Sequence, residues 1–571
     1  MPSRNKTFHP YILLLFILAA AYLPLCTFYF GMKNDAFSDN FPNKFFISQA
    51  LASRHLPVWN AYMNFGFPVY ADMGFAFFNP ITWLFALLGY NAYTLTLEVL
   101  LYIYLGGIFM YRLGRYLKFE TSIAVTVAAM YICSGFFAGC LEYINFLTSA
   151  AFLPLVIQGL LQLFEGPRFK SSFILAIAIY FVFAGGHPAI PIVLLYFIFI
   201  LVVLLFVIFK NYRNNAKKIT IFLLLSFALF AVFYLPAIYS YITVLPYYAR
   251  NNGAVQASYT NAGFTFTSWL SFIFPFATAV NQHMFGTDAS MRNGFFSIAG
   301  FICVICCIKK ATPLVKVLLV TAGIMLLLSL GGGIKVFIYN NLPLLKYIRY
   351  NGEFRVFAIV CFSIIAGFGL QRLATEAKYA RLAANIFKVV LAFGIGVLIV
   401  AGITGYGSIL ATLHKIAVPA GVTDRIKTFL QQGSFTLFMC ISALLAAIIC
   451  LLSIRTLKTG NLNRLLVITV LDVCLNSLLY LPVTGVGQKT LGSIQAVYNT
   501  SPANIPIPPL APVNTIDTLD PVTTGLVGDI TYYNKKIGTA RLTDYPSYFS
   551  STDKFFSDTA AVNEVIKHPY L

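Results

Sequence analysis

Two carboxylates follow the first apolar segment of the chain, Asp35 and Asp39, in the sequence Asn-Asp-Ala-Phe-Ser-Asp-Asn. They are four residues apart, so they share one face if this segment is helical. A carboxylate beside the end of a membrane helix could act as a general base that deprotonates an acceptor hydroxyl. Helix capping or a solvated loop start is the alternative for each of them.

A second polar cluster runs from Lys346 to Arg355, just before an apolar segment at 354–371. The planar fork of arginine forms paired, charge-assisted bonds with phosphate oxygens, so Arg349 and Arg355 are candidate phosphate ligands. The alternative is pairing with lipid headgroups or with Glu353. Together the two clusters could hold a phosphorylated donor and activate an acceptor on one membrane face.

A tight turn between two apolar segments carries His187, in the sequence Gly-Gly-His-Pro. It could bond a phosphate or a sugar hydroxyl, or it could be an ordinary interfacial histidine. Further polar and aromatic residues of the outer loops are candidates for lining the cavity; they are Trp59, Asn60, Glu142, Asn145 and His283. For Trp59, sugar stacking and interfacial anchoring are both open. Asn281 and Asp288 are weaker candidates in the 244–293 loop.

The elements that position these residues are membrane helices. The chain is 59% hydrophobic and 10% charged, with a mean hydropathy of +0.79, which is far outside the range of soluble globular proteins. Segments near twenty apolar residues recur, each long enough to cross about 30 Å of hydrocarbon. We expect an all-α polytopic protein of about thirteen spans, near 10–30, 92–111, 120–140, 146–164, 171–185, 189–209, 219–243, 294–308, 314–331, 354–371, 389–409, 435–454 and 465–483.

The formal charge of +20 is a topology signal. With the N-terminus in the cytoplasm, more than half of the 39 Lys and Arg residues fall on short inner connections, as the positive-inside rule requires. The outer side holds most of the acids, and nucleic-acid binding is not expected. Thirteen spans place a loop at 31–91 and a segment at 484–571 outside the membrane. This last segment begins with a Pro-rich connector and is either a small module or part of a larger domain.

Several other classes of protein are disfavoured. All ten cysteines fall in or beside the expected spans, so a disulfide framework or structural zinc site is not expected. The glycine run at 331–333 lacks the Lys-Ser/Thr of a phosphate-binding loop, and no dinucleotide fingerprint is present. We therefore expect neither nucleotide hydrolysis nor a cofactor, and no ligand spacing indicates a metal.

The loop at 34–80 resembles the corresponding region of the YfhO family of bacterial membrane proteins, which are similar to GT-C glycosyltransferases. The resemblance rests on Asp35, Pro42, Leu-Pro-Val-Trp-Asn at 56–60, Gly-Phe-Pro at 66–68 and Pro80. Further matches are Ser-Gly-Phe at 134–136, Leu-Pro at 153–154, Gly-His-Pro at 186–188, Pro343 with Arg349, and Gly367 with Gly369. They cover most of the domain at 1–483.

The resemblance implies a GT-C fold in the bacterial plasma membrane. It implies a transferase that moves a sugar from a polyprenyl-phosphate donor to a cell-envelope glycopolymer or glycolipid on the extracytoplasmic face. Our own interpretation is an inverting enzyme that works without a metal, and metal dependence is left open. Asp35 has the position of the catalytic base, with Asp39 beside it. Arg349, with Arg355 and His187, would hold the donor phosphate, and the 31–91 loop would roof the cavity.

Two other classes remain open. A transporter or flippase of lipid-linked saccharides would carry functional charges near the bilayer midplane, often in repeated halves. Here the spans hold few acids, mainly Glu98 and Asp472, and no internal repeat is evident. A scaffold for envelope assembly would tolerate loss of any single outer carboxylate.

Overall fold

The computed structural model describes residues 9–33, 35–60, 67–72, 74, 76–244, 263–280, 282–419, 421, 425, 428–429 and 432–499. Of the segment expected at 484–571, only the part up to residue 499 is therefore described. Asn281 lies outside the described residues, as does the side chain of Asp39.

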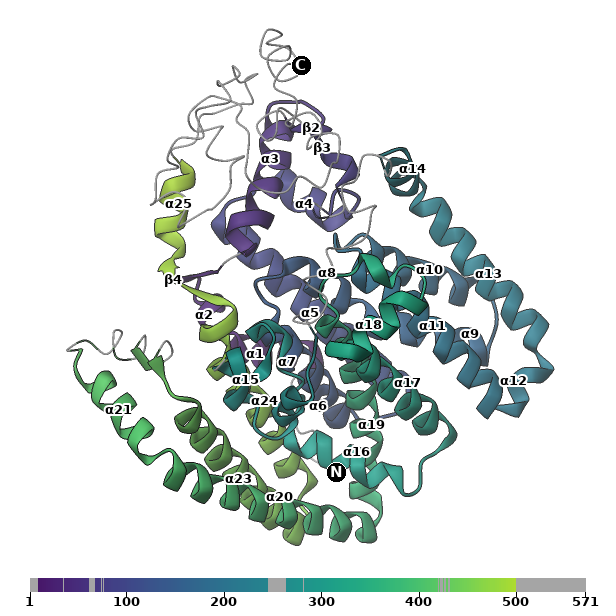
Figure 1. Ribbon diagram of the computed structural model, residues 1–571. Helices are drawn as coiled ribbons and strands as arrows, with labels where there is room; N and C mark the ends of the chain where they lie inside the picture. Colours follow the sequence, from purple (N-terminus) through teal and green to yellow (C-terminus); the bar gives the residue numbers. More distant parts are fainter. Residues whose placement is uncertain are drawn as a thin grey trace, which may run out of the picture.

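The described chain is almost entirely helical (Figure 1). The N-terminal part contains α1 (Pro10–Ala21), α2 (Leu23–Cys26), β1 (Phe30–Met32), η1 (Ala36–Asn40), α3 (Phe41–Ala52), β2 (Trp59–Asn60), β3 (Phe67–Pro68), η2 (Val69–Ala71) and α4 (Pro80–Leu88). A bundle follows, made of α5 (Ala92–Tyr116), α6 (Thr121–Ile132), α7 (Gly135–Gly139), α8 (Ile144–Ala151), α9 (Leu153–Glu165), α10 (Phe169–Phe183), α11 (Ala189–Ile208), α12 (Lys210–Asn214), α13 (Ala216–Phe233) and α14 (Leu235–Val244).

The central part contains η7 (Thr267–Phe272), η8 (Pro275–Ala279), α15 (Gln282–Phe285), η9 (Ala289–Met291), α16 (Ile298–Ile308), α17 (Pro313–Ser329), α18 (Gly332–Asn341), η10 (Leu345–Tyr347) and η11 (Gly352–Phe354). The last elements are α19 (Arg355–Thr375), α20 (Ala377–Thr404), α21 (Tyr406–Ala417), α23 (Phe435–Thr459), α24 (Leu462–Thr484), β4 (Val486–Thr490) and α25 (Leu491–Asn499).

Nine helices in the described ranges are long and apolar enough to cross a membrane, which makes the chain a multi-pass membrane protein. The helices α16 and α17 are bent by 118° at their junction. If the two together form one span, the number of spans is ten. The thirteen expected spans are therefore not confirmed. Two of the others are short: α1 has 12 residues and α10 has 15, or about 18 and 22 Å of helix, less than the hydrocarbon thickness.

The bundle has a buried centre and an exposed edge. The apolar window of the α6–α7 span is 94% buried, and α6 contacts α1, α5, α19 and α24. By contrast, the window of α20 is only 17% buried, and α20 pairs mainly with α23. Figure 1 shows α20, α21 and α23 as a layer beside the main bundle. An apolar helix that is exposed along most of its length is stable only against lipid.

The first loop is folded and is tied to the bundle. Its helix α3 carries Lys44, whose ammonium lies 2.7 Å from both carboxylate oxygens of Glu98 on α5. The hydroxyl of Tyr90 donates to the same carboxylate at 3.0 Å. Lys44 and Glu98 are buried, so the acid that interrupts the apolar pattern of α5 is fully neutralised by the loop.

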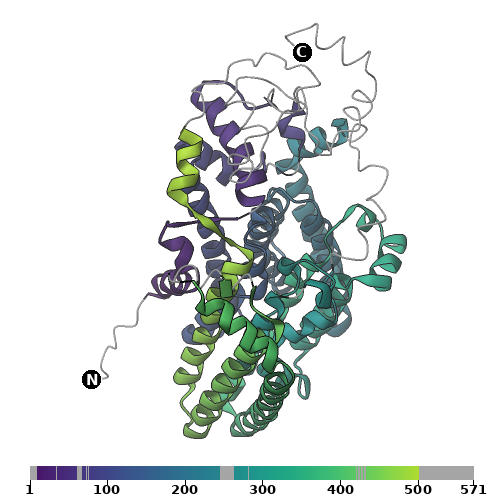
Figure 2. The same cartoon turned by 60° about the vertical axis from the view of Figure 1, so that its left-hand side comes forward.

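A small antiparallel sheet joins the two ends of the membrane domain. In this sheet β1, after the first helix pair, pairs with β4, after α24, with Phe30 opposite Thr490 and Met32 opposite Val486. Figures 1 and 2 show α25 beside α3 on the side of the molecule that carries the first loop. The first loop and the start of the C-terminal segment thus lie on one face. That this face is the extracytoplasmic one stays a prediction.

Candidate functional site

Asp35 stands at the junction between β1 and η1, where the chain leaves the sheet and turns into the first loop. Phe37 and Phe41 anchor this turn: both are buried, and the Phe41 ring meets Tyr498 of α25 edge-on at 4.2 Å. Among the described residues, the Asp35 side chain makes no capping hydrogen bond to η1. The half-buried carboxylate is therefore not used as a helix cap.

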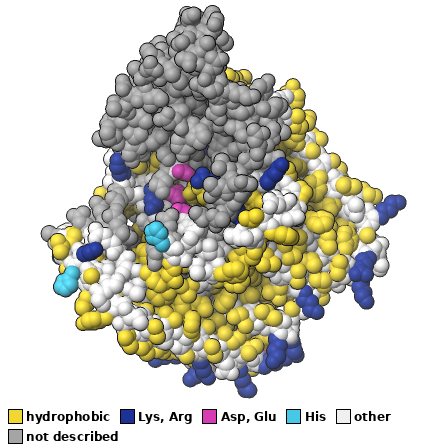
Figure 3. Space-filling model, in the orientation of Figure 1, with side chains coloured by type: hydrophobic (Ala, Val, Ile, Leu, Met, Phe, Trp, Pro, Cys, Tyr) yellow, Lys and Arg dark blue, Asp and Glu magenta, His cyan; other side chains and the backbone are white. Residues whose placement is uncertain are grey.

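Charged groups from distant parts of the chain surround Asp35. Burial raises the pKa of Asp35, the charge of Asp288 raises it further, and the charge of Arg349 lowers it. Burial likewise lowers the pKa of Lys33, an effect that the charges of Glu142 and Asp288 oppose. We call Lys33, Asp35, Glu142, Asp288 and Arg349 the charged cluster. Figure 3 shows acidic and basic side chains together in the middle of this face, at the edge of the undescribed atoms.

Most other Lys and Arg side chains in this view lie along the lower and right-hand rim, beyond a wide apolar belt (Figure 3). This separation is the one that the positive-inside rule predicts for a membrane protein. In this view the apolar belt separates the acidic and basic side chains near the middle from the basic rim.

The loop that carries Asp288 is held by two buried arginines. Asp288 Oδ1 accepts from the Ser290 amide at 2.9 Å and from its hydroxyl at 2.5 Å, which fixes the carboxylate. Arg292 donates from Nε to the Thr287 carbonyl at 2.8 Å. Arg355 donates from Nε to the Asn293 carbonyl at 2.7 Å and from Nη2 to the Ser290 carbonyl.

Arg355 is fully buried, at 0% exposure, and lies over the ring of Phe136. Its third donor group, Nη1, bonds the Gly352 carbonyl at 2.7 Å. Because its guanidinium donates to backbone carbonyls on three sides, this environment favours a structural role for Arg355 over the phosphate contact that we expected from the sequence. Arg349, by contrast, is exposed, and its guanidinium lies 4.8 Å from the centre of the Tyr350 ring.

An aromatic row, Phe146, Tyr143 and Tyr350, connects His187 with the charged cluster. The His187 ring meets Phe146 edge-on at 4.4 Å, Phe146 stacks on Tyr143 at 4.9 Å, and Tyr143 lies 6.2 Å from Tyr350. The pKa of the Tyr143 hydroxyl is raised by burial and by the charges of the acids in the cluster. The row therefore places His187 at one end of the site and the acids near the other.

The remaining predicted cavity residues have different positions. Glu142 belongs to the charged cluster, and Asn145, nearly buried, donates to the Gly74 carbonyl of the first loop at 2.9 Å. Trp59, about half exposed, and Asn60, fully buried, form β2 of the β2–β3 hairpin. His283 is exposed on α15, and the charge interactions that define the cluster do not include it. A cavity role for these last three stays a prediction.

Sequence reasoning did not single out Lys33 or the aromatic row, and it named Asp288 only as a weaker candidate. Lys33 had a usable signal, since it is a cation two residues from Asp35 on the side where cations are rare. The tyrosines had none, because aromatic residues are common throughout the chain. Over the described ranges, no three His, Cys, Asp or Glu side chains are grouped so that they could hold a metal ion.

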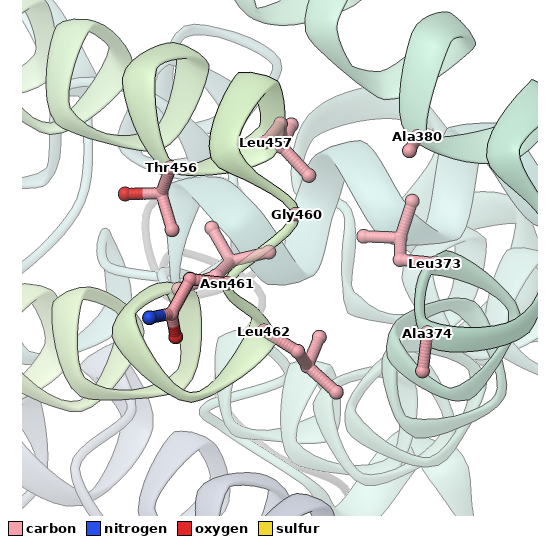
Figure 4. Close-up of a pocket in the computed structure, with 9 residues that line it drawn as sticks. Leu373, Ala374, Ala380, Thr456, Leu457, Gly460, Asn461 and Leu462 are labelled. Atoms are coloured by element: carbon pink, nitrogen blue, oxygen red, sulfur yellow. The ribbon is translucent and has the colours of Figure 1, made fainter.

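Two cavities of the described chain lie away from the charged cluster. One, of about 110 Å³, lies where α19 and α23 end and α20 and α24 begin, and its lining is mainly apolar (Figure 4). Leu373 in its wall is separated from Arg355 by roughly 27 Å of helix, so it belongs to the opposite end of the bundle. A wider, almost wholly apolar groove of about 460 Å³ lies between α20 and α23.

The apolar helices define a helical multi-pass membrane protein. The chain has the fold of ArnT from Cupriavidus metallidurans in the apo state, with a TM-score of 0.53 and 13% identity over 98% of this chain and 91% of that chain. ArnT bound to undecaprenyl phosphate aligns with a TM-score of 0.48 and 13% identity, over 97% of this chain and 90% of that one. The arabinofuranosyltransferase AftD from Mycobacteria aligns with a TM-score of 0.41 and 13% identity, over 79% of this chain and 26% of AftD.

No protein-family model and no curated protein matches the sequence. The likeness to apo ArnT confirms the GT-C fold expected from the sequence, and membership of the YfhO family stays a prediction.

Proposed function

We propose that this protein is a membrane glycosyltransferase of the YfhO type. It takes a sugar from a polyprenyl-phosphate donor and transfers it, with inversion, to a glycopolymer or glycolipid of the cell envelope. The reaction takes place on the extracytoplasmic face of a bacterial plasma membrane, with the N-terminus in the cytoplasm. The observation that carries the proposal is the charged cluster around Asp35, which lies on the loop-bearing face of a GT-C fold.

Asp35 is the proposed base. The acceptor hydroxyl oxygen attacks the anomeric carbon of the sugar and gives its proton to the Asp35 carboxylate. The bond between this carbon and the phosphate oxygen breaks, and its electron pair leaves with the polyprenyl phosphate, which gains one negative charge. Burial and the charge of Asp288 raise the pKa of Asp35, which makes it a stronger base than a solvated aspartate. Asp39 stays a candidate beside it.

Arg349 and His187 are the proposed phosphate ligands. Arg349 is exposed, and its main-chain carbonyl accepts a 2.7 Å hydrogen bond from the ammonium of Lys335. A guanidinium and an imidazolium on the side where the phosphate leaves would stabilise the charge that grows in the transition state. For Arg355 we propose that it positions the Ser290 and Asn293 carbonyls, and hence the loop that carries Asp288.

The lipid part of the donor needs an apolar path from the charged cluster to the bilayer. The groove between α20 and α23 supports such a path, because Phe276 of η8 stacks on Phe438 of α23 at 4.5 Å. On its other side, a main-chain carbonyl of η8 accepts a hydrogen bond from Arg292, which lies in the loop that follows Asp288. ArnT, which shares the fold, has been crystallised with undecaprenyl phosphate, and this supports the choice of donor class.

The two acids inside the spans favour a transferase over a transporter of lipid-linked saccharides. Glu98 is neutralised by Lys44, and Asp472 Oδ2 accepts from the Ile298 amide at 2.9 Å and from the Ser297 hydroxyl at 3.1 Å. Both carboxylates therefore serve the fold, whereas a transporter needs charges near the midplane that are free to exchange partners.

The test uses the purified protein in lipid nanodiscs with a panel of radiolabelled polyprenyl-phosphate sugars and envelope extract as the acceptor source. We expect the wild type to consume one donor and Asp35→Asn to consume none, while both elute and melt alike. Equal turnover by Asp35→Asn would remove this residue from the mechanism. Movement of labelled lipid between the leaflets, without sugar release, would favour the transporter. Full function of the variant in cells would favour a scaffold.

A further inference from the structure

Glu353 is a buried carboxylate that the proposed chemistry does not yet use. It lies in η11 at 0% exposure, and its Oε2 atom is 3.5 Å from Nδ1 of His187. The His187 side chain is 26% exposed, so the pair has a closed end at the carboxylate and an open end at the imidazole. A carboxylate without water costs free energy unless a positive charge or a donor is close.

The chain holds His187 in place from the other side. Gly186, at a φ of +87°, lets the turn pass against the backbone of Ala76 in the first loop, where any Cβ would lie within about 3 Å of three Ala76 atoms. The Thr148 hydroxyl donates to the Gly185 carbonyl at 2.8 Å. With Phe146 against its ring, His187 is fixed by its neighbours even before a ligand binds.

Two positive charges oppose the cost of burying Glu353. Burial raises the pKa of Glu353 well above its ordinary value, and the charges of Arg355 at the start of α19 and Lys335 on α18 lower it. Burial and the charge of Arg349 lower the pKa of Lys335 to about 8, and the charge of Glu353 opposes this shift. A negative charge close to an imidazole favours its protonated form. The thiol of Cys140 also interacts with Glu353 and Arg355.

We propose that Glu353 is a positioning residue for His187: its carboxylate faces Nδ1–H and keeps the ring protonated, so that Nε2–H is available to an anionic phosphate at the open end. This inference deepens the proposed function and rests on it for the identity of the ligand. The pair itself is a property of the fold. In carboxylate–histidine pairs of this kind, the carboxylate sets the charge and the orientation of the imidazole ring.

The experiment reads the protonation of His187 directly. Protein labelled with ¹⁵N-histidine is prepared in nanodiscs as wild type, Glu353→Gln and Glu353→Asp, and His187→Gln identifies the signal. An opposite charge at this distance changes the protonation equilibrium by a factor of about ten or more. We expect the ratio of protonated to neutral His187 at pH 7.5 to fall about tenfold in Glu353→Gln and by less in Glu353→Asp. Glu376→Gln, which removes a partly exposed acid at the far end of α19, should change nothing.

Binding of undecaprenyl phosphate is then measured at pH 7.5 with the same proteins. We expect weaker binding in Glu353→Gln, and no further loss when this change is added to His187→Gln. An unchanged ratio of protonated to neutral His187 in a folded Glu353→Gln protein would overturn the pairing. If Glu353→Gln weakens binding as much in the His187→Gln protein as in the wild type, Glu353 acts only through packing. Neither measurement uses donor turnover, so absence of transferase activity would count against the proposed function alone.

Discussion

The ion pair between Lys44 and Glu98 offers a test that needs no substrate. Lys44 is on α3, which begins directly after the η1 turn that starts at Asp35, and Glu98 is on the span α5. Both side chains are buried, at 2% and 0% exposure, and the ammonium lies 2.7 Å from each carboxylate oxygen. Lys44→Met removes the charge and keeps most of the volume. It also releases the helix that continues from the proposed base.

The expected cost follows from the charge that remains. Breaking a buried ion pair by removing one partner costs about 3–5 kcal/mol, because the other charge stays in a medium of low dielectric. Glu98 retains one hydrogen bond, from the Tyr90 hydroxyl at 3.0 Å, so the lower end of that range, about 3 kcal/mol, applies. In a large domain this corresponds to a fall of about 5 °C or more in the melting midpoint.

Melting is followed by the loss of monodisperse protein in detergent, for the wild type, Lys44→Met, Glu98→Leu and the double variant. The double variant replaces the pair by apolar groups and leaves no buried charge, so its midpoint should return to within a few degrees of the wild type. If Lys44→Met melts like the wild type, or if the two losses simply add, the pair does not anchor the loop and this reasoning fails.

Two further predictions concern pH. If Asp35 is the base, kcat/KM falls as the pH drops through the raised pKa of Asp35. Asp288→Asn removes a neighbouring negative charge, so this fall in kcat/KM should move to lower pH. If it does not move, Asp35 is not its source. Folding lowers the pKa of Lys335 from its ordinary value to about 8, so between pH 8 and 10 the unfolded chain binds the proton more tightly and stability rises with pH. Lys335→Met should lack this rise, and parallel melting curves of the two proteins from pH 7 to 10 would contradict the assignment.

The sequence predicted the positions of the helices better than the number of membrane spans. Each expected span overlaps a helix, because runs of apolar residues identify membrane helices with little ambiguity. The count of thirteen was not confirmed because hydropathy does not report geometry. The segments 294–308 and 314–331 both read as spans, yet the structure bends α16 and α17 by 118° at a short junction.

The candidate site was predicted only in part. The position of Asp35 followed from the end of the first apolar run, but its approach to Asp288 and Arg349 depends on packing between segments more than 250 residues apart. The sequence offered both Arg349 and Arg355 as candidate phosphate ligands, with Arg349 as the main one. The η11 turn between them leaves the first exposed and buries the second at a helix start, a difference that no spacing rule predicts.

Gly367 is one of the residues on which the resemblance to the YfhO family rests, and its surroundings show a packing reason for a glycine there. Gly367 in α19 lies so close to Phe119 that an added Cβ would be 2.3 Å from the ring. A match at this position therefore reports tight packing between α19 and the connection from α5 to α6, and it carries no information on chemistry. The fold could be inferred from such positions with more certainty than the reaction.

The connections of α24 bear on how a substrate reaches the site. The Ser477 hydroxyl donates to the Cys133 carbonyl at 2.9 Å, which ties α24 to the buried centre of the bundle. One turn further, the Tyr480 hydroxyl donates to the Ala289 carbonyl at 2.9 Å, which ties the same helix to the loop of Asp288. A transporter that rocks one helix bundle against another must break the contacts across the moving interface. Here the two bonds and the β1–β4 pairing hold the end of α24 to three different parts of the chain. A transferase needs no such motion, because its donor and acceptor can enter from the face where these contacts already assemble the charged cluster.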